Sequence, residues 1–485
     1  MTLSLIAALL VSLVIGSAVM WRMCPRTVPT TSDGLLVLSL GIGSGLGLCS
    51  LLLFLWLALS HGNGTREPIL AVLLAILLAG AAALRWRRPA APSPDVPGRL
   101  PWLKAAFGIA AVAAVVSFVL FCLHAPSGGW DAWSAWNRDA RFMFRGGEHW
   151  RDVLSSAEAG WTPGYPMLTP GAVAYCWYFV KTETLLAPNA IGFLFTLSVV
   201  GLLVSSLSLL RSGSQGLIAG IILLCSPQFI MQATKQYADV PLASFYLGAI
   251  VLLCLHDSLE DQRGWLVMAG MLTGMAAWTK NEGLLFALVL VLVRCVVVCT
   301  SHGARAWVRE VLPFALGLLP VLTVVFYFKF CMVGPGGDLA IQSGGTHDAM
   351  GRVMEQTPHA FLDRLLTVDR YLLIAKEFGS QVIAFGGWVV MLPPLLLMYM
   401  WVPGVNQARK DRPAIYTGLL TLILMTCGYF MVYVITPHNL AWHLNFSLDR
   451  VLMQLWPLAI FTFFLLVRTM EEAAGEGPAD LEIRN

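Results

Sequence analysis

The sequence predicts an all-α protein, a polytopic bundle of about 13 transmembrane helices with one amphipathic helix at the membrane interface. Two features of the composition support this class: 57% of the residues are hydrophobic and only 12% are charged. A third feature is that long apolar runs recur along the chain, separated by short polar segments. Soluble globular domains carry about twice this share of charged residues.

The apolar runs give the expected positions of the spans. They lie at residues 3–20, 34–58, 69–84, 101–123, 185–210, 215–233, 240–256, 264–279, 283–300, 311–331, 381–402, 414–436 and 451–468. No Lys or Arg precedes the first run, whereas Arg22 and Arg26 follow it. We therefore expect an anchor with its N-terminus outside, because a cleaved signal peptide has the opposite charge order.

Lys and Arg in the loops predict the orientation, since cytoplasmic loops are enriched in both residues. The strongest basic loops run from Arg85 to Lys104, from Arg305 to Arg309 and from Arg409 to Arg412. Alternation from these loops places five polar segments outside: 124–166, 234–239, 280–282, 332–380 and 437–450. Segment 167–181 is too short to cross a bilayer as a helix, so we expect it to dip into the membrane.

Several protein classes do not fit the chain. The net charge of +3, without a basic run, gives no sign of nucleic-acid binding. The ten cysteines form no CxxC pair and are mostly in apolar runs, as expected of small core residues. His438 and His443 are five residues apart, off one helical face, so a divalent metal could bind but is not indicated.

Unusual polar residues near the ends of the spans gather on the predicted outer face. They are Asp131, Lys235, Asp239, Lys280, Glu282, His438, His443, Asp449 and Arg450. A transporter is expected to place ionisable groups near the middle of the bilayer. Their position at one surface favours chemistry at the outer membrane interface.

Two acidic residues each have a structural and a functional interpretation. Asp131 begins a segment in which Trp133, Trp136 and Met143 share one helical side, typical of an interfacial helix with Asp131 as its N-cap. Asp131 could instead be a catalytic base at the lipid surface. Asp239 precedes Pro241, so it could cap the helix that begins there or contribute to a site.

Lys280 and Glu282 lie in the middle of a hydrophobic stretch that is too long for a single span. The stretch must therefore fold back, with the charged residues at a tight bend on one membrane face. Because Gly283 and Asn281 would suffice for a turn, the charges indicate a polar site at the membrane surface.

Four motifs together resemble the GT-C superfamily of membrane glycosyltransferases. They are Asp131 in the first large outer loop, Ser226-Pro227 with Tyr237-Ala-Asp239-Val-Pro-Leu, Thr279-Lys-Asn-Glu-Gly283, and His443 with Ser447-Leu-Asp-Arg450. The chain is similar to bacterial protein O-mannosyltransferases and to the lipid A aminoarabinose transferase. The resemblance covers about residues 101–468; it leaves 1–100 as additional N-terminal helices and 469–485 as a cytoplasmic tail.

The resemblance implies inverting transfer of a sugar from a polyprenyl-phosphate donor to an acceptor hydroxyl at the outer face. It implies Asp131 as the general base, and Asp239 as a second acid because Ala132 follows Asp131 where many relatives carry a paired acid. Lys280 and Arg450 suit the departing phosphate. The remaining residues expected to contact substrate are Glu282, His443, Trp130 and Tyr237.

The resemblance also sets the expected partners and setting. These are a glycan, lipid or protein acceptor, membrane lipids, no required cofactor, and a bacterial inner membrane with the site facing the periplasm. We expect segment 333–380 to act as a mobile acceptor lid. Two alternatives are a polysaccharide polymerase or ligase using lipid-linked sugars, and a non-enzymatic transporter, which a wide separation of Asp131 and Asp239 would favour.

Overall fold

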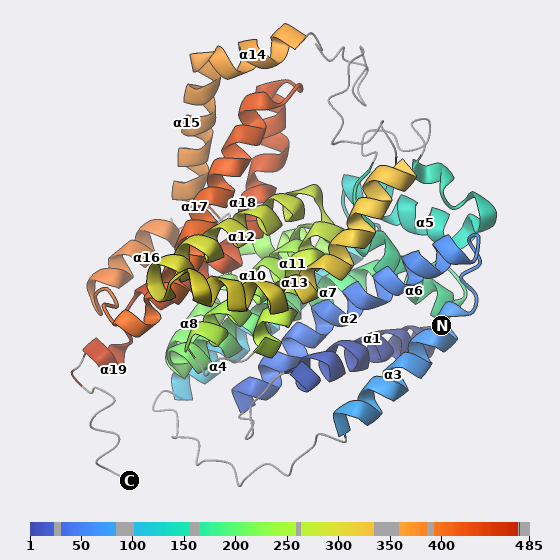
Figure 1. The fold of residues 1–485 in the computed structure, drawn as a ribbon, viewed down its shortest axis with the longest axis horizontal. Coiled ribbons are helices and arrows are strands. Elements are labelled where there is room, and N and C mark those ends of the chain that lie inside the picture. Colours follow the sequence, from blue (N-terminus) through green and yellow to red (C-terminus); the bar gives the residue numbers. More distant parts are fainter. Residues whose placement is uncertain are drawn as a thin grey trace.

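The computed structural model describes residues 1–23, 31–83, 101–154, 164–258, 263–333, 358–385, 392–473 and 475. Within these ranges the chain is helical and has no β-sheet, only an isolated bridge between Val405 and Val467. The expected all-α class is confirmed (Figure 1).

The first part of the chain forms a helical layer and the loop that follows it. Its elements are α1 (Thr2–Met23), α2 (Thr31–Leu59), α3 (Glu67–Ala83), α4 (Pro101–His124), η1 (Ala132–Trp136), α5 (Asn137–Arg145), η2 (Gly147–His149), η3 (Asp152–Leu154) and α6 (Leu168–Val180). Helices α1, α2 and α3 lie side by side at one end of the bundle (Figure 1). With 13 residues, α6 is shorter than a membrane span, as expected for segment 167–181.

The rest of the chain supplies the centre and the other end of the bundle. Its elements are α7 (Leu186–Leu210), α8 (Gly213–Leu224), α9 (Pro227–Thr234), α10 (Asp239–Ser258), α11 (Arg263–Thr279), α12 (Asn281–His302), α13 (Ala304–Phe326), η4 (Tyr327–Val333), α14 (Pro358–Leu366), α15 (Val368–Ala384), α16 (Leu392–Trp401), η6 (Arg409–Asp411), α17 (Arg412–Ile435), α18 (Leu440–Leu466) and α19 (Met470–Ala473). Every residue of α10 from Asp239 to His256 is buried, because α10 is apolar on all sides and lies between α7, α11, α17 and α18.

The described residues contain nine helices that are long and apolar enough to cross a membrane, or ten if the bent pair α8 and α9 counts as one span. The expectation of about 13 spans refers to the whole chain and includes shorter or partly undescribed apolar runs, which this count leaves out. Helices α3 and α11 have only 17 residues each. The run 381–402 is shared between α15 and α16, with 386–391 outside the described residues.

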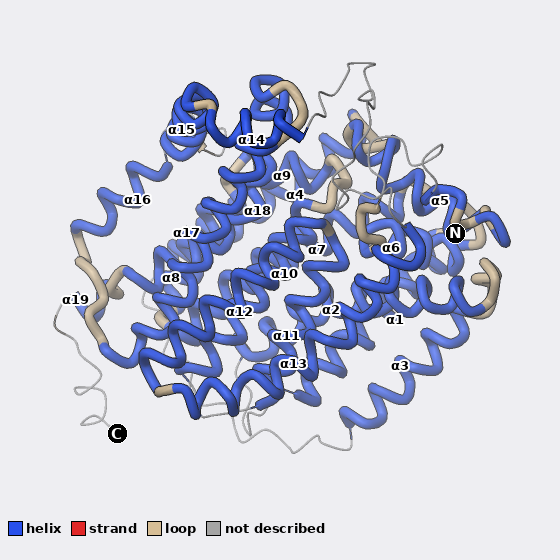
Figure 2. The backbone as a smooth tube through the Cα atoms, turned by 45° about the horizontal axis from the view of Figure 1, so that its top comes forward, coloured by secondary structure: helices blue, strands red, loops and turns tan. Residues whose placement is uncertain are grey.

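The segment 437–450 differs most from expectation. It was expected to be an outer loop, but α18 begins at Leu440 and continues without a break to Leu466. The predicted span 451–468 is therefore only the second part of a longer helix. Beside it, α14 and α15 pack at the end of α17 and α18 (Figure 2), where Arg370 donates hydrogen bonds to the last carbonyl groups of α17. Of the expected lid, residues 334–357 lie outside the described residues.

Candidate active site

Asp239, the first residue of α10, is the most heavily hydrogen-bonded acid in the described structure. Its Oδ1 accepts from Lys280 Nζ at 3.1 Å and from Gln454 Nε2 at 2.6 Å. Its Oδ2 accepts from Arg450 Nε at 3.2 Å and from Arg450 Nη2 at 3.0 Å. The residue is completely buried, and these four contacts offset the cost of burying its charge.

Arg450 connects this acid to Asp131, which precedes η1 in the first large loop. Its Nη2 lies 2.7 Å from Asp131 Oδ2 and 3.0 Å from Asp239 Oδ2. No group in the described ranges hydrogen-bonds the other oxygen of Asp131, Oδ1, although it is buried. Asp131 thus has one oxygen fixed by Arg450 and one that is available to a ligand.

Lys280 precedes α12 and is shared by two carboxylates. Its Nζ lies 3.1 Å from Asp239 Oδ1 and 2.8 Å from Glu282 Oε1. Burial lowers the pKa of Lys280, but the negative charges of Asp239 and Glu282 raise it by more than burial lowers it. The pKa of Lys280 therefore lies well above its usual value. Lys280 is therefore a permanent cation. We refer to Asp131, Asp239, Lys280, Glu282, Arg450 and Gln454 as the Asp239 network.

Helix α18 contributes to the network because its polar residues recur with helical spacing. His443, Ser447, Arg450 and Gln454 follow one another at intervals of three or four residues, which places them on one face. Each of the other three pairs with α17 or the residue that follows it. Tyr433 Oη lies 2.7 Å from Ser447 Oγ, Tyr429 donates to Gln454 Oε1 at 2.7 Å, and His443 Nδ1 lies 2.9 Å from Thr436 Oγ1.

The loop that carries Asp131 is held against the α9–α10 junction by the side chain of Gln236. Its amide donates to Asn189 Oδ1 at 2.7 Å and to the Pro126 carbonyl at 2.9 Å, and it accepts from Asn137 Nδ2 at 2.9 Å. Gln236 has a φ of +59°, in the left-handed region. Gly128 is also left-handed, and a Cβ atom there would lie 2.6 Å from the Lys235 carbonyl oxygen, so only glycine permits this close approach.

Aromatic rings surround the Asp131 end of the network. The Tyr237 ring lies 4.3 Å from the guanidinium carbon of Arg450. Trp136 is buried and stacks on Tyr165, with the ring centroids 5.5 Å apart. The interfacial helix expected from Asp131 onward is present as η1 and α5, but it buries Trp136 and Met143 in the protein, and of its apolar side mainly Trp133 remains exposed.

The structure brings six of the eight sequence-predicted site residues into contact: Asp131, Asp239, Lys280, Glu282, Arg450 and Tyr237. His443 is on the same face of α18 as Arg450 but contacts Thr436 and Tyr433. Trp130 directly precedes Asp131, but 54% of its surface is exposed and its ring lies against Trp133.

Residues 184–328 match the family model described as dolichyl-phosphate-mannose-protein mannosyltransferase. The resemblance to GT-C glycosyltransferases is confirmed. The match supports an integral membrane glycosyltransferase of the GT-C type.

The GT-C family match includes Tyr237, Asp239, Lys280 and Glu282, whereas Asp131 and Arg450 lie outside it. The match covers less than half of the chain, and it leaves out three members of the Asp239 network: Asp131, Arg450 and Gln454. Searches of curated proteins and of solved structures gave no match.

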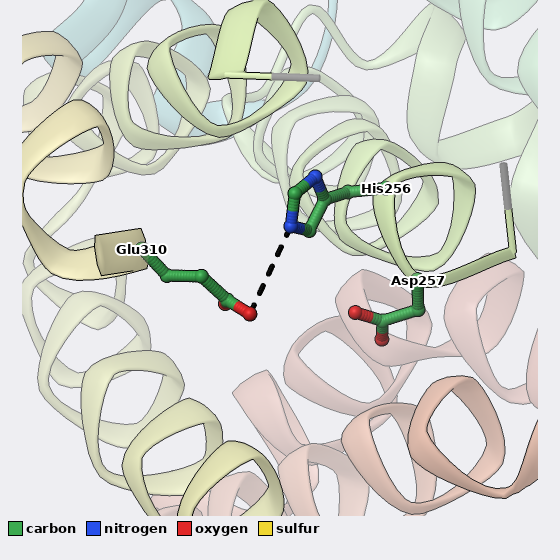
Figure 3. Close-up of side chains that lie close together, drawn as sticks. All are labelled: His256, Asp257 and Glu310. Atoms are coloured by element: carbon green, nitrogen blue, oxygen red, sulfur yellow. Dashed lines mark ion pairs between the residues drawn. The ribbon is translucent and has the colours of Figure 1, made fainter. Parts of the chain in front are cut away.

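One group of side chains in the described residues has the spacing of metal ligands. His256 and Asp257 at the end of α10 face Glu310 of α13, with His256 Nε2 3.8 Å from Glu310 Oε1 (Figure 3). Arg294 already forms ion pairs with both acids. Its Nη1 and Nη2 donate to Asp257 at 2.8 and 2.9 Å, and Nη2 donates to Glu310 at 2.7 Å. The guanidinium supplies the positive charge that a metal ion would bring.

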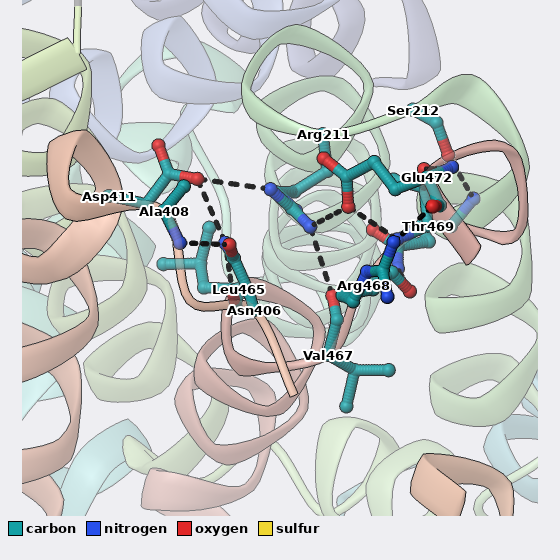
Figure 4. A network of polar contacts seen from close by, with 11 residues as sticks. Arg211, Ser212, Asn406, Ala408, Asp411, Leu465, Val467, Arg468, Thr469 and Glu472 are labelled. Carbon is teal, nitrogen blue, oxygen red and sulfur yellow. Dashed lines mark hydrogen bonds and ion pairs between the residues drawn. The ribbon is translucent and has the colours of Figure 1, made fainter. Parts of the chain in front are cut away.

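A second polar group ties the end of α18 to α7 (Figure 4). Arg211 donates to Asp411 Oδ2 at 3.1 Å, to Glu472 Oε2 at 2.8 Å and to the Val467 carbonyl at 3.1 Å. Asn406 completes the group with a hydrogen bond to Asp411. All of these residues lie at predicted inner ends of spans, where they fasten the chain segment after α18.

Four residues of the site were not predicted from the sequence: Gln454, Gln236, Trp136 and Lys329. Gln454 stands alone within an apolar run, and nothing in its spacing marked it before α18 was known to extend to Leu440. Lys329 in η4 is buried and donates to the Gly164 carbonyl and to Asn281 Oδ1, next to Tyr165 and Lys280. A single lysine inside an apolar stretch was the available signal.

Proposed function

We propose that the protein transfers a sugar from a polyprenyl-phosphate donor to an acceptor hydroxyl, with inversion, at the Asp239 network. The observation that carries the proposal is the position of Arg450 Nη2, 2.7 Å from Asp131 and 3.0 Å from Asp239. Arg450 thus places Asp131, a carboxylate with an available oxygen, beside two buried cations, Arg450 itself and the Lys280 that shares Asp239. Transfer of a sugar from a phosphate requires such a base together with cations for the leaving group.

Asp131 is the proposed general base. Arg450 fixes Oδ2, and Oδ1 has no partner in the described ranges. As the acceptor oxygen forms its bond to C1 of the sugar, Oδ1 takes the hydroxyl proton and the bond between C1 and the phosphate oxygen breaks. A positioned base of this kind contributes about 10²–10⁴-fold in rate.

Asp239 has a different proposed role, because all its hydrogen-bonding capacity faces protein groups. Its four contacts hold Lys280 and Arg450 on either side of one carboxylate. We infer that Asp239 positions both cations and takes no proton from the substrate. This separates it from Asp131, whose oxygens have unequal surroundings.

Lys280 and Arg450 are the proposed ligands of the departing phosphate. Both are largely buried, so their charges act in a medium of low polarity, where hydrogen bonds to an anionic phosphate are strongest. Lys280 also lies at the N-terminus of α12, whose unpaired N–H groups favour an anion. Tyr237 and His443 are the proposed contacts of the sugar and the acceptor.

The orientation inferred from the basic loops supports a site on the extracytoplasmic side. Asp239 and Lys280 stand at the starts of α10 and α12, in segments expected outside. The proposed setting is therefore the inner membrane of a bacterium, with the site facing the periplasm and the prenyl tail in the lipid.

The test is a transfer assay with purified protein in lipid nanodiscs. Polyprenyl-phosphate sugars and candidate glycan, lipid and peptide acceptors are incubated with the protein, and the products are identified by mass spectrometry. We expect a glycosylated acceptor with inverted anomeric configuration, together with polyprenyl phosphate. Absence of product with every lipid-linked sugar, or retention of configuration, would contradict the proposal.

A further inference from the structure

Lys280 is shared by two carboxylates whose surroundings differ. Asp239 is completely buried and holds four N–H groups. The side chain of Glu282 is 21% exposed, and Lys280 is its only polar partner in the described ranges. Of the two, Glu282 is the one that can leave Lys280 without losing any other contact.

The charges of the Asp239 network favour such a departure when a phosphate binds. Lys280 and Arg450 carry two positive charges, against three negative charges on Asp131, Asp239 and Glu282. Asp239 and Glu282 take two of the three N–H groups of Lys280, so a phosphate on the third would lie beside the Glu282 carboxylate, which is 2.8 Å from Nζ. Like charges this close together repel strongly away from bulk water.

The repulsion differs between the lipid that enters and the lipid that leaves. The sugar-bearing donor is a phosphodiester with one negative charge. The polyprenyl phosphate left after transfer is a monoester, with a charge of about −1.5 to −2 at neutral pH. A fixed carboxylate beside the phosphate therefore opposes the product more than the donor.

We propose that Glu282 competes with the lipid-linked phosphate for Lys280 and thereby promotes release of the polyprenyl phosphate product. This inference rests on the proposed function, since it assumes a phosphate at Lys280. While the donor is bound, Glu282 turns toward solvent. After transfer, its return to Lys280 displaces the more highly charged monoester.

Glu282 also has a simpler structural role, because an acid in the first turn of α12 complements the helix dipole. That role alone predicts a loss of stability on Glu282→Gln and no gain in phosphate affinity. The competition predicts tighter phosphate binding after the same substitution. The two roles therefore differ in the sign of a measured quantity.

The experiment measures binding of farnesyl phosphate, its methyl diester and farnesol to the full chain in nanodiscs at about pH 8, where the monoester is a dianion. The proteins are the wild type, E282Q, K280A and the control D369N, which removes an exposed acid from the first turn of α15. We expect E282Q to bind the monoester about tenfold more tightly and the diester about threefold more tightly. K280A should bind both more weakly, and D369N should match the wild type.

The possible outcomes separate this inference from the proposed function. If K280A weakens binding but E282Q leaves monoester affinity unchanged or reduced, the phosphate site stands and the role of Glu282 is wrong. If K280A binds both phosphates as well as the wild type, the phosphate site and the role of Glu282 both fail. Should E282Q not fold, E282A replaces it, because the expected gain comes from removal of the charge.

Discussion

Arg450 and Asp239 are joined by two hydrogen bonds from one guanidinium to one carboxylate oxygen, at 3.2 and 3.0 Å. The first residue lies in α18 and the second begins α10, so the pair fastens two helices together where the chemistry is proposed to occur. A buried pair of this kind is strongly destabilised when one partner is lost, because the other charge remains uncompensated.

For this pair we expect Asp239→Ala to lower the free energy of unfolding by about 3–5 kcal/mol and to abolish transfer. The reason is that Lys280 and Arg450 would be left buried beside each other without their shared acid. The measurement is thermal unfolding in nanodiscs together with the transfer assay. An Ala variant with unchanged stability would show that Asp239 does not hold the cations.

Replacement of Asp131 should give the opposite pattern. Asp131→Asn keeps an oxygen for Arg450 but removes the proton acceptor, so we expect transfer to fall by about 10²–10⁴-fold with little change in the unfolding temperature. The assay compares initial rates at saturating donor. A variant that transfers at nearly the wild-type rate would exclude Asp131 as the base.

Gln236 tests whether the position of the Asp131 loop matters. Gln236→Gly removes three hydrogen bonds of the amide but relieves the left-handed backbone, which costs a non-glycine residue about 1–2 kcal/mol. We expect transfer to fall roughly 10- to 100-fold, because the base would no longer be fixed against α10. Gln236→Ala, which keeps the strain, should lose as much activity and be less stable. Full activity of the Gly variant would remove Gln236 from the site.

Asp139 in α5 should make stability depend on pH. Burial raises its pKa to about 6, although Arg138 acts in the opposite direction. Because the folded-state pKa lies above that of the unfolded chain, the stabilising contribution is complete below about pH 4 and is lost as the pH rises through about 6. The Asn variant cannot ionise, so we expect its unfolding temperature, relative to wild type, to increase between these values. A constant difference would contradict the assignment.

The group around Arg294 gives a prediction about metal removal. Because Arg294 pairs with both Asp257 and Glu310, we expect a chelator to leave the unfolding temperature unchanged. Arg294→Gln should lower stability by about 3–5 kcal/mol, since it leaves two acids without their counter-charge. A fall in the unfolding temperature on chelation would instead show that this group holds an ion.

Much of the site was predictable because charged residues are rare in this chain. Asp131, Asp239, Lys280 and Arg450 are conspicuous beside long apolar runs, and the basic loops place all four on one expected face. Their mutual distances were not predictable, since they depend on how α10, α12 and α18 pack.

The elements that were predicted incorrectly have a common physical reason. Residues 437–450 have the composition of a loop, yet His443 and Ser447 fall on one side of α18 and pair with the residue after α17 and with α17. Hydropathy averages over all sides of a helix and cannot detect this. Gln454 and Gln236 were missed because an uncharged amide in an apolar or turn segment has no distinctive pattern.

The distance along the chain between Asp239 and Arg450 has a consequence for biogenesis. The two residues are 211 positions apart, whereas Lys280 follows Asp239 after only 41. At ribosomal rates of about 5–20 residues per second, the acid waits roughly 10–40 s for its guanidinium partner. The insertion machinery therefore holds a nascent helix whose leading carboxylate gains Lys280 after 41 residues and Arg450 only after 211.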